Sequence, residues 1–250
     1  MDMGDEGETA TDEETAEGEQ SDAKPTPLAP PARFRGTRRA LGAFCRTGNS
    51  QELRRAVGHY VRTGYGGSAT MTRRLGGTAA TAGRLGGVLQ SGRTPDGADL
   101  RDAVLASGND VNVVLDAIVD AASPADGSQD KESSRRAVRD ALSELLVRFP
   151  DADLLALTDA QRVFVIERYA ALDVYGRFCL DLHKTVLEKA ADPATGLRRL
   201  SSIREFIVQH VSAAFRAVRE RGASATTKSV ARLTREALRE TLGVFEDYTT

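Results

Sequence analysis

The chain of 250 residues has no tryptophan, and aromatic residues make up only 5% of it. A hydrophobic core must therefore rest mainly on leucine, valine and alanine, and this composition favours helices that pack closely through small side chains. The sequence also lacks any run of about 18 apolar residues, so no membrane-spanning helix is expected. The acidic N-terminal region has neither the basic nor the apolar part of a signal peptide. We expect a cytoplasmic protein that does not bind a membrane.

Cysteine is nearly absent as well. Cys45 and Cys179 are the only two, and they lie far apart in helical patterns. A disulfide framework needs more cysteines than this, so both are expected to be reduced thiols.

Basic residues are scarce in the first 32 residues. This segment carries ten acids and a single base, Lys24, for a formal charge of −9, and it contains no aromatic residue, valine or isoleucine. Such a segment cannot offset the entropy lost on ordering, so we expect a disordered acidic tail over residues 1–32. Four prolines close the tail and predict a stiff spacer: Pro25, Pro27, Pro30 and Pro31.

Acids and lysine are missing from the next segment, residues 33–93. It holds twelve arginines, no lysine, 13 of the 23 glycines and one acid, Glu52, for a formal charge of +11. Exclusive use of arginine favours bidentate contact with carboxylate or phosphate groups. We therefore expect residues 33–93 to be an Arg/Gly-rich helical interaction segment, followed by a helical body domain over residues 94–250.

Hydrophobic periodicity predicts an all-α, multi-helix fold with no strand. Thr158 and Gln161 fit a capping box that opens a long helix with a continuous apolar stripe. We expect a further helix that is capped by Ser68 and runs towards Gln90. It contains the tetrapeptide Arg-Leu-Gly-Gly twice. Such a glycine-rich helix is stable only if the glycines permit close approach to another helix or to a partner. The other expected helices cover 37–47, 50–62 (capped by Asn49 or Ser50), 100–106, 110–121, 131–149, 193–221 and, capped by Thr226 or Thr227, a last one to about 248.

No constellation of side chains predicts catalysis. Cys179 and His183 lie four residues apart on one expected helix, but no second Cys/His pair completes a metal site, so Cys179 is interpreted as a packed core residue. The glycines of 64–68 precede a helix, yet the Gly-Lys-Ser/Thr ending of a phosphate loop is missing. We expect no catalytic residue, metal or cofactor, and no enzyme.

The expected function is contact with a polyanion or with an acidic protein face. Nucleic acid is the alternative partner, although few aromatic residues are interleaved with the arginines for base stacking. A solvated basic face that the chain's own acidic tail partly neutralises is a third possibility. The candidate partner-binding residues are Arg38, Arg39, Arg54, Arg55, Arg62, Tyr65, Gly66, Gly67, Arg73, Arg74, Gly76, Gly77 and Arg84.

Several segments resemble a known family. They read PARFRGTRRALG at 31–42, GHYVRTGYGGS at 58–68, FPDADLL at 149–155 and DVYGRFCLD at 173–181. The chain is similar over roughly residues 30–248 to the QatB family, the second component of bacterial Qat-type antiphage defence operons.

The resemblance implies a non-enzymatic helical subunit that acts beside an ATPase, a QueC-like enzyme and a TatD-like nuclease. It also implies a partner, or a protein substrate, of the QueC-like enzyme, with an N-terminal glycine as the acceptor. This chain begins Met1-Asp2-Met3-Gly4, and Asp2 disfavours simple removal of Met1. Modification at Gly4 would therefore require a protease that exposes this glycine.

Overall fold

The computed structural model describes residues 32–106, 110–123, 125–222 and 229–249. Over these ranges the chain is helical, with no β-strand and one isolated bridge between Arg93 and Asp99. The all-α prediction is thus confirmed. The elements are α1 (Arg35–Thr47), α2 (Ser50–His59), the π-helix η1 (Tyr60–Gly64), α3 (Ser68–Arg74), α4 (Gly76–Ser91), α5 (Leu100–Ala106), α6 (Val111–Ala122), α7 (Gln129–Arg148), α8 (Asp159–Lys189), α9 (Pro193–Glu220) and α10 (Val230–Asp247).

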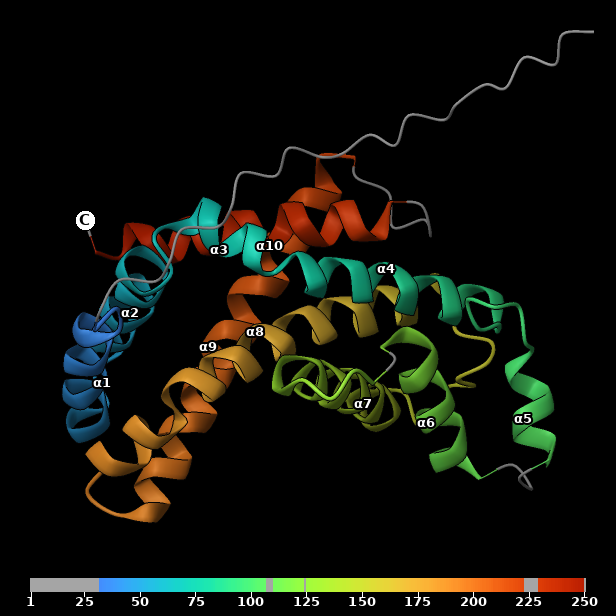
Figure 1. Cartoon of the computed structure of the whole chain (residues 1–250), viewed down its shortest axis with the longest axis horizontal. Coiled ribbons are helices and arrows are strands. Elements are labelled where there is room, and N and C mark those ends of the chain that lie inside the picture. Colours follow the sequence, from blue (N-terminus) through green and yellow to red (C-terminus); the bar gives the residue numbers. More distant parts are fainter. Residues whose placement is uncertain (1–31, 107–109, 124, 223–228, 250) are drawn as a thin grey trace, which may run out of the picture.

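The 31-residue helix α8 is central to the packing (Figure 1). It packs against α7 and α9 along its length, against α4, and near its C-terminal end against α1. Thr158 caps it through the expected capping box: its hydroxyl accepts the Gln161 N–H, and the Gln161 side chain accepts the Thr158 N–H. The stripe that includes Val165, Tyr169 and Leu182 is buried, so this helix was predicted correctly.

α1 and α2 form an antiparallel hairpin at one end of the molecule (Figure 1). Gly48 ends α1 in the left-handed conformation (φ 72°), and the Asn49 side chain caps α2 by accepting the Gln51 N–H at 2.8 Å. α3 and α4 then lie along α10, whereas α5 and α6 form the opposite end.

Two expected helices differ in the structure. The helix expected over 50–62 changes at Tyr60 into the wider π turn η1. The helix expected from Ser68 to Gln90 is interrupted at Leu75 (φ −85°, ψ 14°), which separates α3 from α4. Ser68 is not the cap, since that position belongs to Gly67. These breaks follow from tertiary packing, because Leu75 is buried and both flanking helices pack against other parts of the fold.

The second Arg-Leu-Gly-Gly copy, Arg84–Gly87, and the glycine just before it show why glycine is tolerated inside α4. A Cβ on Gly83 would lie 3.1 Å from the Ala231 Cβ, and one on Gly86, within the copy, would lie 3.1 Å from the Val230 Cγ2. These two glycines permit close approach of α4 to α10. In the first copy, a Cβ on Gly76 or Gly77 would have no neighbour within 4 Å.

A single hydrophobic cluster runs from Phe34 to Phe245 and includes residues from both 33–93 and 94–250. Within the described residues no helix is both long enough and apolar enough to cross a membrane. Two expectations lie outside the described residues: the disorder of residues 1–31, and the caps Thr226 and Thr227. α10 begins instead after Ser229.

Candidate interaction surface

A buried aromatic cluster lies at the start of the described chain. The hydroxyls of Tyr60 and Tyr65 donate to the same carboxylate oxygen of Asp181 on α8, at 2.9 and 2.8 Å. Their rings pack edge to face at 5.1 Å, and Phe34 stacks on Tyr60 at 5.5 Å. The wider π turn brings Tyr60 and Tyr65 to the same side. Both phenols have pKa values raised above the usual range, because they are buried and lie beside the Asp181 carboxylate.

Arg33 completes this cluster. Its guanidinium lies 4.4 Å from the centre of the Phe34 ring and 3.5 Å from Asp181. Tyr65, a candidate partner-binding residue, is therefore buried with its hydroxyl already bonded, and its position argues for an anchoring role at the base of the α1–α2 hairpin.

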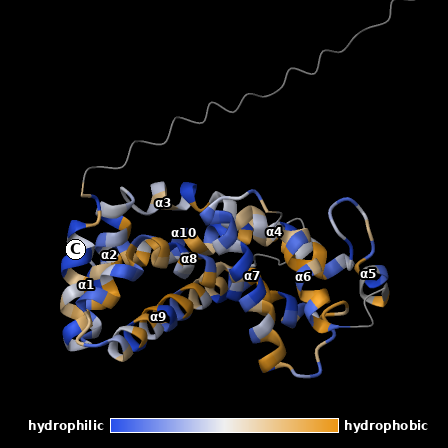
Figure 2. Cartoon of the chain, turned by 60° about the horizontal axis from the view of Figure 1, so that its bottom comes forward, coloured by the Kyte–Doolittle hydropathy of each residue, from blue (hydrophilic) through white to orange (hydrophobic). Residues whose placement is uncertain are grey.

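Exposed arginines cover the outside of this hairpin. We call α1, α2 and η1 with these side chains the basic hairpin: Arg35, Arg38, Arg39, Arg46, Arg54, Arg55 and Arg62. The hydrophilic residues that recur along α1 and α2 are visible in Figure 2. The hairpin lies on the body through its opposite side, where Leu41, Phe44 and Leu53 are buried.

The arginines of the basic hairpin have few internal partners. Arg55 pairs with Glu52 at 3.3 Å, Arg62 donates to Thr249 at 3.4 Å, and the Arg54 guanidinium lies 5.7 Å from the Tyr248 ring centre. The side chains of Arg38 and Arg39 are exposed and, within the described part of the chain, make no hydrogen bond or ion pair. These two are the side chains best placed to bind an external acidic group.

His59 lies within the positive potential of the basic hairpin. Its ring lies against Gly36 of α1, where a Cβ would be 3.1 Å from the ring. Partial burial, followed by the charges of Arg55 and Arg62, lowers the pKa of His59 below its ordinary value. A neutral imidazole here adds no charge near pH 7, so the excess positive charge comes from arginine.

The Gly66-Gly67 turn before α3 does not offer an open phosphate cradle. Both glycines have positive φ (79° and 99°), and the Ser68 N–H at the helix start donates to the Glu246 carboxylate at 2.9 Å. This hydrogen bond lowers the pKa of Glu246. The chain's own carboxylate therefore occupies the place that an anion would take.

The remaining candidate residues do not share the surface of the basic hairpin. Arg73 is exposed on α3 and donates to Thr70, while Arg74 is half-buried with its guanidinium 5.6 Å from the Tyr65 ring centre. Arg84 holds α4 to α6 by donating to the Ala122 carbonyl at 2.8 Å, with Thr81 as a second acceptor. Arg84 therefore has a structural role, because it links α4 to α6.

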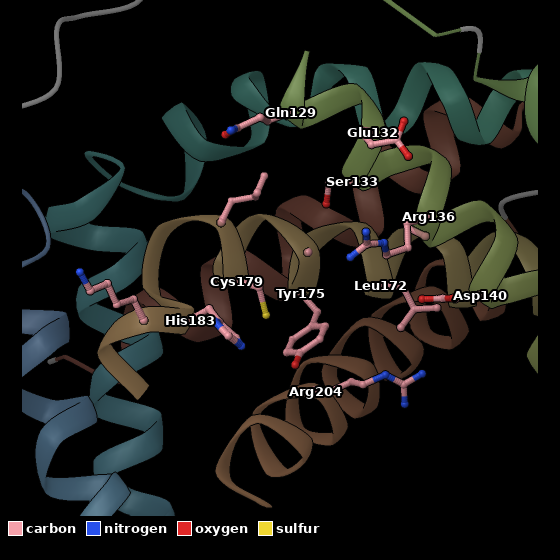
Figure 3. A pocket seen from close by; sticks show the side chains of 14 residues that line it. Gln129, Glu132, Ser133, Arg136, Asp140, Leu172, Tyr175, Cys179, His183 and Arg204 are labelled. Carbon is pink, nitrogen blue, oxygen red and sulfur yellow. The ribbon is translucent and has the colours of Figure 1, made fainter. Parts of the chain in front are cut away.

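The sequence did not indicate a groove between α7, α8 and α9, with a volume of about 730 Å³ (Figure 3). Helices α7 and α8 approach closely there, since a Cβ on Gly176 of α8 would lie 2.4 Å from the Ser133 hydroxyl of α7. Cys179, Tyr175 and His183 line the groove. Cys179 packs against the core but is only half-buried, so its interpretation as a core cysteine holds in part.

The groove does not present an activated nucleophile. Burial raises the pKa of the Cys179 thiol, and burial together with the neighbouring thiol raises that of Tyr175. Both groups are therefore protonated at neutral pH, the unreactive form for a thiol. Among the described residues, no group of three or more histidines, cysteines or acids is placed to hold a metal ion.

Apolar side chains are exposed at the opposite end from the basic hairpin. Leu105 of α5 is 69% exposed and Val111 of α6 is 46% exposed, and together with Leu155 they line a shallow groove. Val147, near the end of α7, is 83% exposed.

Comparison with known protein families identifies a match over most of the chain. The model of a protein family described as Qat anti-phage system associated protein QatB matches residues 66–245. No curated protein and no solved structure gives a significant match.

Proposed function

This chain belongs to the QatB family, a component of Qat anti-phage defence systems, and we propose that it acts there as a non-enzymatic interaction subunit in the cytoplasm. In this proposal the basic hairpin docks an acidic face of another protein of the system. The partners we propose, from the family resemblance, are the QueC-like enzyme, the ATPase and the TatD-like nuclease of the same operon.

One observation carries the proposal: seven exposed arginines on α1, α2 and η1 face solvent with Glu52 as the only acid of the hairpin. Arginine forks match carboxylates in a bidentate manner, and desolvated Arg–carboxylate contacts are frequent at the centre of interfaces. The absence of an activated nucleophile in the α7–α8–α9 groove supports a role outside catalysis.

Charge reversal on the hairpin tests this proposal. Arg38→Glu with Arg39→Glu should weaken assembly with the operon partners at least tenfold and abolish protection against phage, because like charges then face the acidic partner. Helical content should stay unchanged, since both side chains are exposed. The matched control, Arg216→Glu with Arg232→Glu, makes the same change in charge on exposed positions of α9 and α10.

Co-purification from cells that express the whole operon gives the readout, together with plaque counts. If the hairpin variant assembles and protects as well as the control, the hairpin is only a solvated surface.

Nucleic acid remains the second candidate partner for the same arginines. The aromatic residues nearest to them, Phe34, Tyr60 and Tyr65, are buried and bonded to one another, which argues against a base-stacking platform. If nucleic acid is the partner, the logarithm of the binding constant for DNA or RNA should fall steeply and linearly with the logarithm of the salt concentration. Tight binding of nucleic acid that weakens steeply with salt, together with no binding of any operon protein, would favour this alternative.

We also propose, from the family resemblance, that the QueC-like enzyme modifies this chain near its N-terminus after a protease exposes Gly4, which lies outside the described residues. Intact mass spectrometry tests this point. Coexpression with the operon partners should give a shortened chain that starts at a glycine and carries an added mass on that residue. Recovery of the unmodified Met1–Thr250 chain from an active complex would contradict the substrate role and leave the docking role intact.

A further inference from the structure

The basic hairpin has a large excess of positive charge that the described part of the chain leaves unneutralised. Of its seven exposed arginines, only Arg55 has an ion-pair partner among the described residues, Glu52. The carboxylate of Glu246, close to Arg62, is already bonded to the Ser68 N–H at the start of α3. Partial burial is the first cause of the lowered pKa of His59, and the charges of Arg55 and Arg62 add to it. The hairpin therefore presents positive charge that anionic groups from elsewhere can neutralise.

The same chain carries such groups immediately before the hairpin. Residues 1–31 contain ten acids and one base, for a formal charge of −9, and the ten acids all lie within residues 2–22. This stretch joins the described chain at Ala32. A turn closed by the Arg35 N–H and the Ala32 carbonyl (2.8 Å) redirects the chain there, at the start of α1. The acidic stretch and the arginines are thus tethered at one point.

The tether is long enough for the two to meet. A chain of 31 residues that follows random-coil statistics has an end-to-end distance of about 30 Å. α1, with its 13 residues, is about 20 Å long. The ten residues between Asp22 and Arg33 include four prolines, a composition that favours an extended spacer.

Tethering makes weak contacts sufficient. A short linker holds a ligand at an effective concentration in the millimolar range, so the acids need only a modest affinity for the arginines to occupy them most of the time. Exposed ion pairs contribute about 0–1 kcal/mol each, but several act at once here.

We propose that residues 1–31 dock back onto the basic hairpin of the same molecule and occupy Arg38, Arg39, Arg54 and their neighbours until the acidic segment is displaced or removed. The contact itself does not depend on the docking function proposed above. Its consequence does: shortening of the chain by a protease would free the arginines for an acidic partner at the moment when the complex assembles.

Small-angle X-ray scattering of the full chain tests the contact without any partner. A docked acidic segment is released as salt rises, so the radius of gyration should increase by about 2 Å between 10 mM and 500 mM sodium chloride, with each value extrapolated to zero protein concentration. A free acidic segment behaves in the opposite way, because salt screens the repulsion among its own charges and lets it contract.

The matched control replaces arginines of the hairpin with glutamine in the full chain: Arg38→Gln, Arg39→Gln, Arg54→Gln and Arg55→Gln. These positions are exposed, so the fold should be retained, which circular dichroism verifies. We expect expansion with salt in the native chain and contraction or no change in the glutamine variant. Contraction of the native chain, or equal expansion of both chains, would overturn the proposal. If the native chain expands and the variant does not, the contact stands even where no operon protein binds the hairpin.

Discussion

At the scale of single residues, the structure separates candidate residues that face solvent from those already bound inside the fold. Arg38 and Arg39 are exposed, whereas Tyr65 is bonded to Asp181 and Arg84 to the Ala122 carbonyl. The sequence indicated the arginine-rich composition correctly. The internal acceptors could not be predicted from the sequence. Asp181 lies 116 residues from Tyr65, and the Ala122 acceptor is a backbone carbonyl, which every residue has.

Cys179 offers a residue-scale test of the groove between α7, α8 and α9. Its thiol pKa is raised from 9.0 by burial, so the reactive thiolate is scarcer at neutral pH than in a free cysteine. Iodoacetamide should alkylate Cys179 more slowly than free cysteine at about pH 7.5, and the rate should rise as pH increases beyond the ordinary thiol pKa.

Peptide mass spectrometry follows this reaction, and Cys179→Ala identifies the modified site. Cys45, fully buried, should stay unmodified in the folded protein. Alkylation of Cys179 faster than that of free cysteine at neutral pH would indicate an activated thiol and reopen the question of catalysis.

At the scale of elements, local signals predicted helix starts and stops well where they act on their own. The Thr158 capping box and the Asn49 cap were both expected and both are present. The break at Leu75 and the π turn at Tyr60–Gly64 were not expected, since each depends on packing against elements distant in sequence. The two Arg-Leu-Gly-Gly copies also look alike in sequence and differ in surroundings.

That difference predicts opposite responses to alanine. Gly77→Ala should raise the free energy of unfolding by about 0.5 kcal/mol, because alanine favours the helix and its Cβ meets nothing within 4 Å. Gly83→Ala, immediately before the second copy, should give no gain or a loss, since its Cβ would lie 3.1 Å from the Ala231 Cβ, just as a Cβ on Gly86 within the copy would lie 3.1 Å from the Val230 Cγ2.

Urea unfolding of both variants beside the native chain measures these changes. Equal gains at the two positions would show that α4 and α10 are not in close contact. If Gly77→Ala stabilises the protein yet weakens assembly, Gly77 is a point where a partner backbone approaches.

At the scale of the whole molecule, residues 33–93 and 94–250 contribute to one hydrophobic cluster. α10, near the end of the chain, packs against α3 and α4 as well as against α9, so the part of its face that includes the buried Val230 depends on the first segment for cover. Composition separated the two segments by charge, but charge on the surface does not determine which helices share a core.

We therefore predict that residues 94–250 do not fold when expressed alone. Circular dichroism should show no cooperative thermal transition for that piece, whereas residues 33–250 should retain a single transition close to that of the full chain. A cooperative transition for residues 94–250 would establish the body as an independent domain.

The length of α8 sets how many neighbours the molecule can hold at once. Its 31 residues extend for about 46 Å, from the region of Leu154 and Leu155 to the base of the α1–α2 hairpin. A domain of about 100 residues has a radius of gyration near 13 Å. Two bodies of that size, one at the basic hairpin and one at the exposed apolar end, would fit side by side without collision, so occupancy of one end imposes no steric limit on the other.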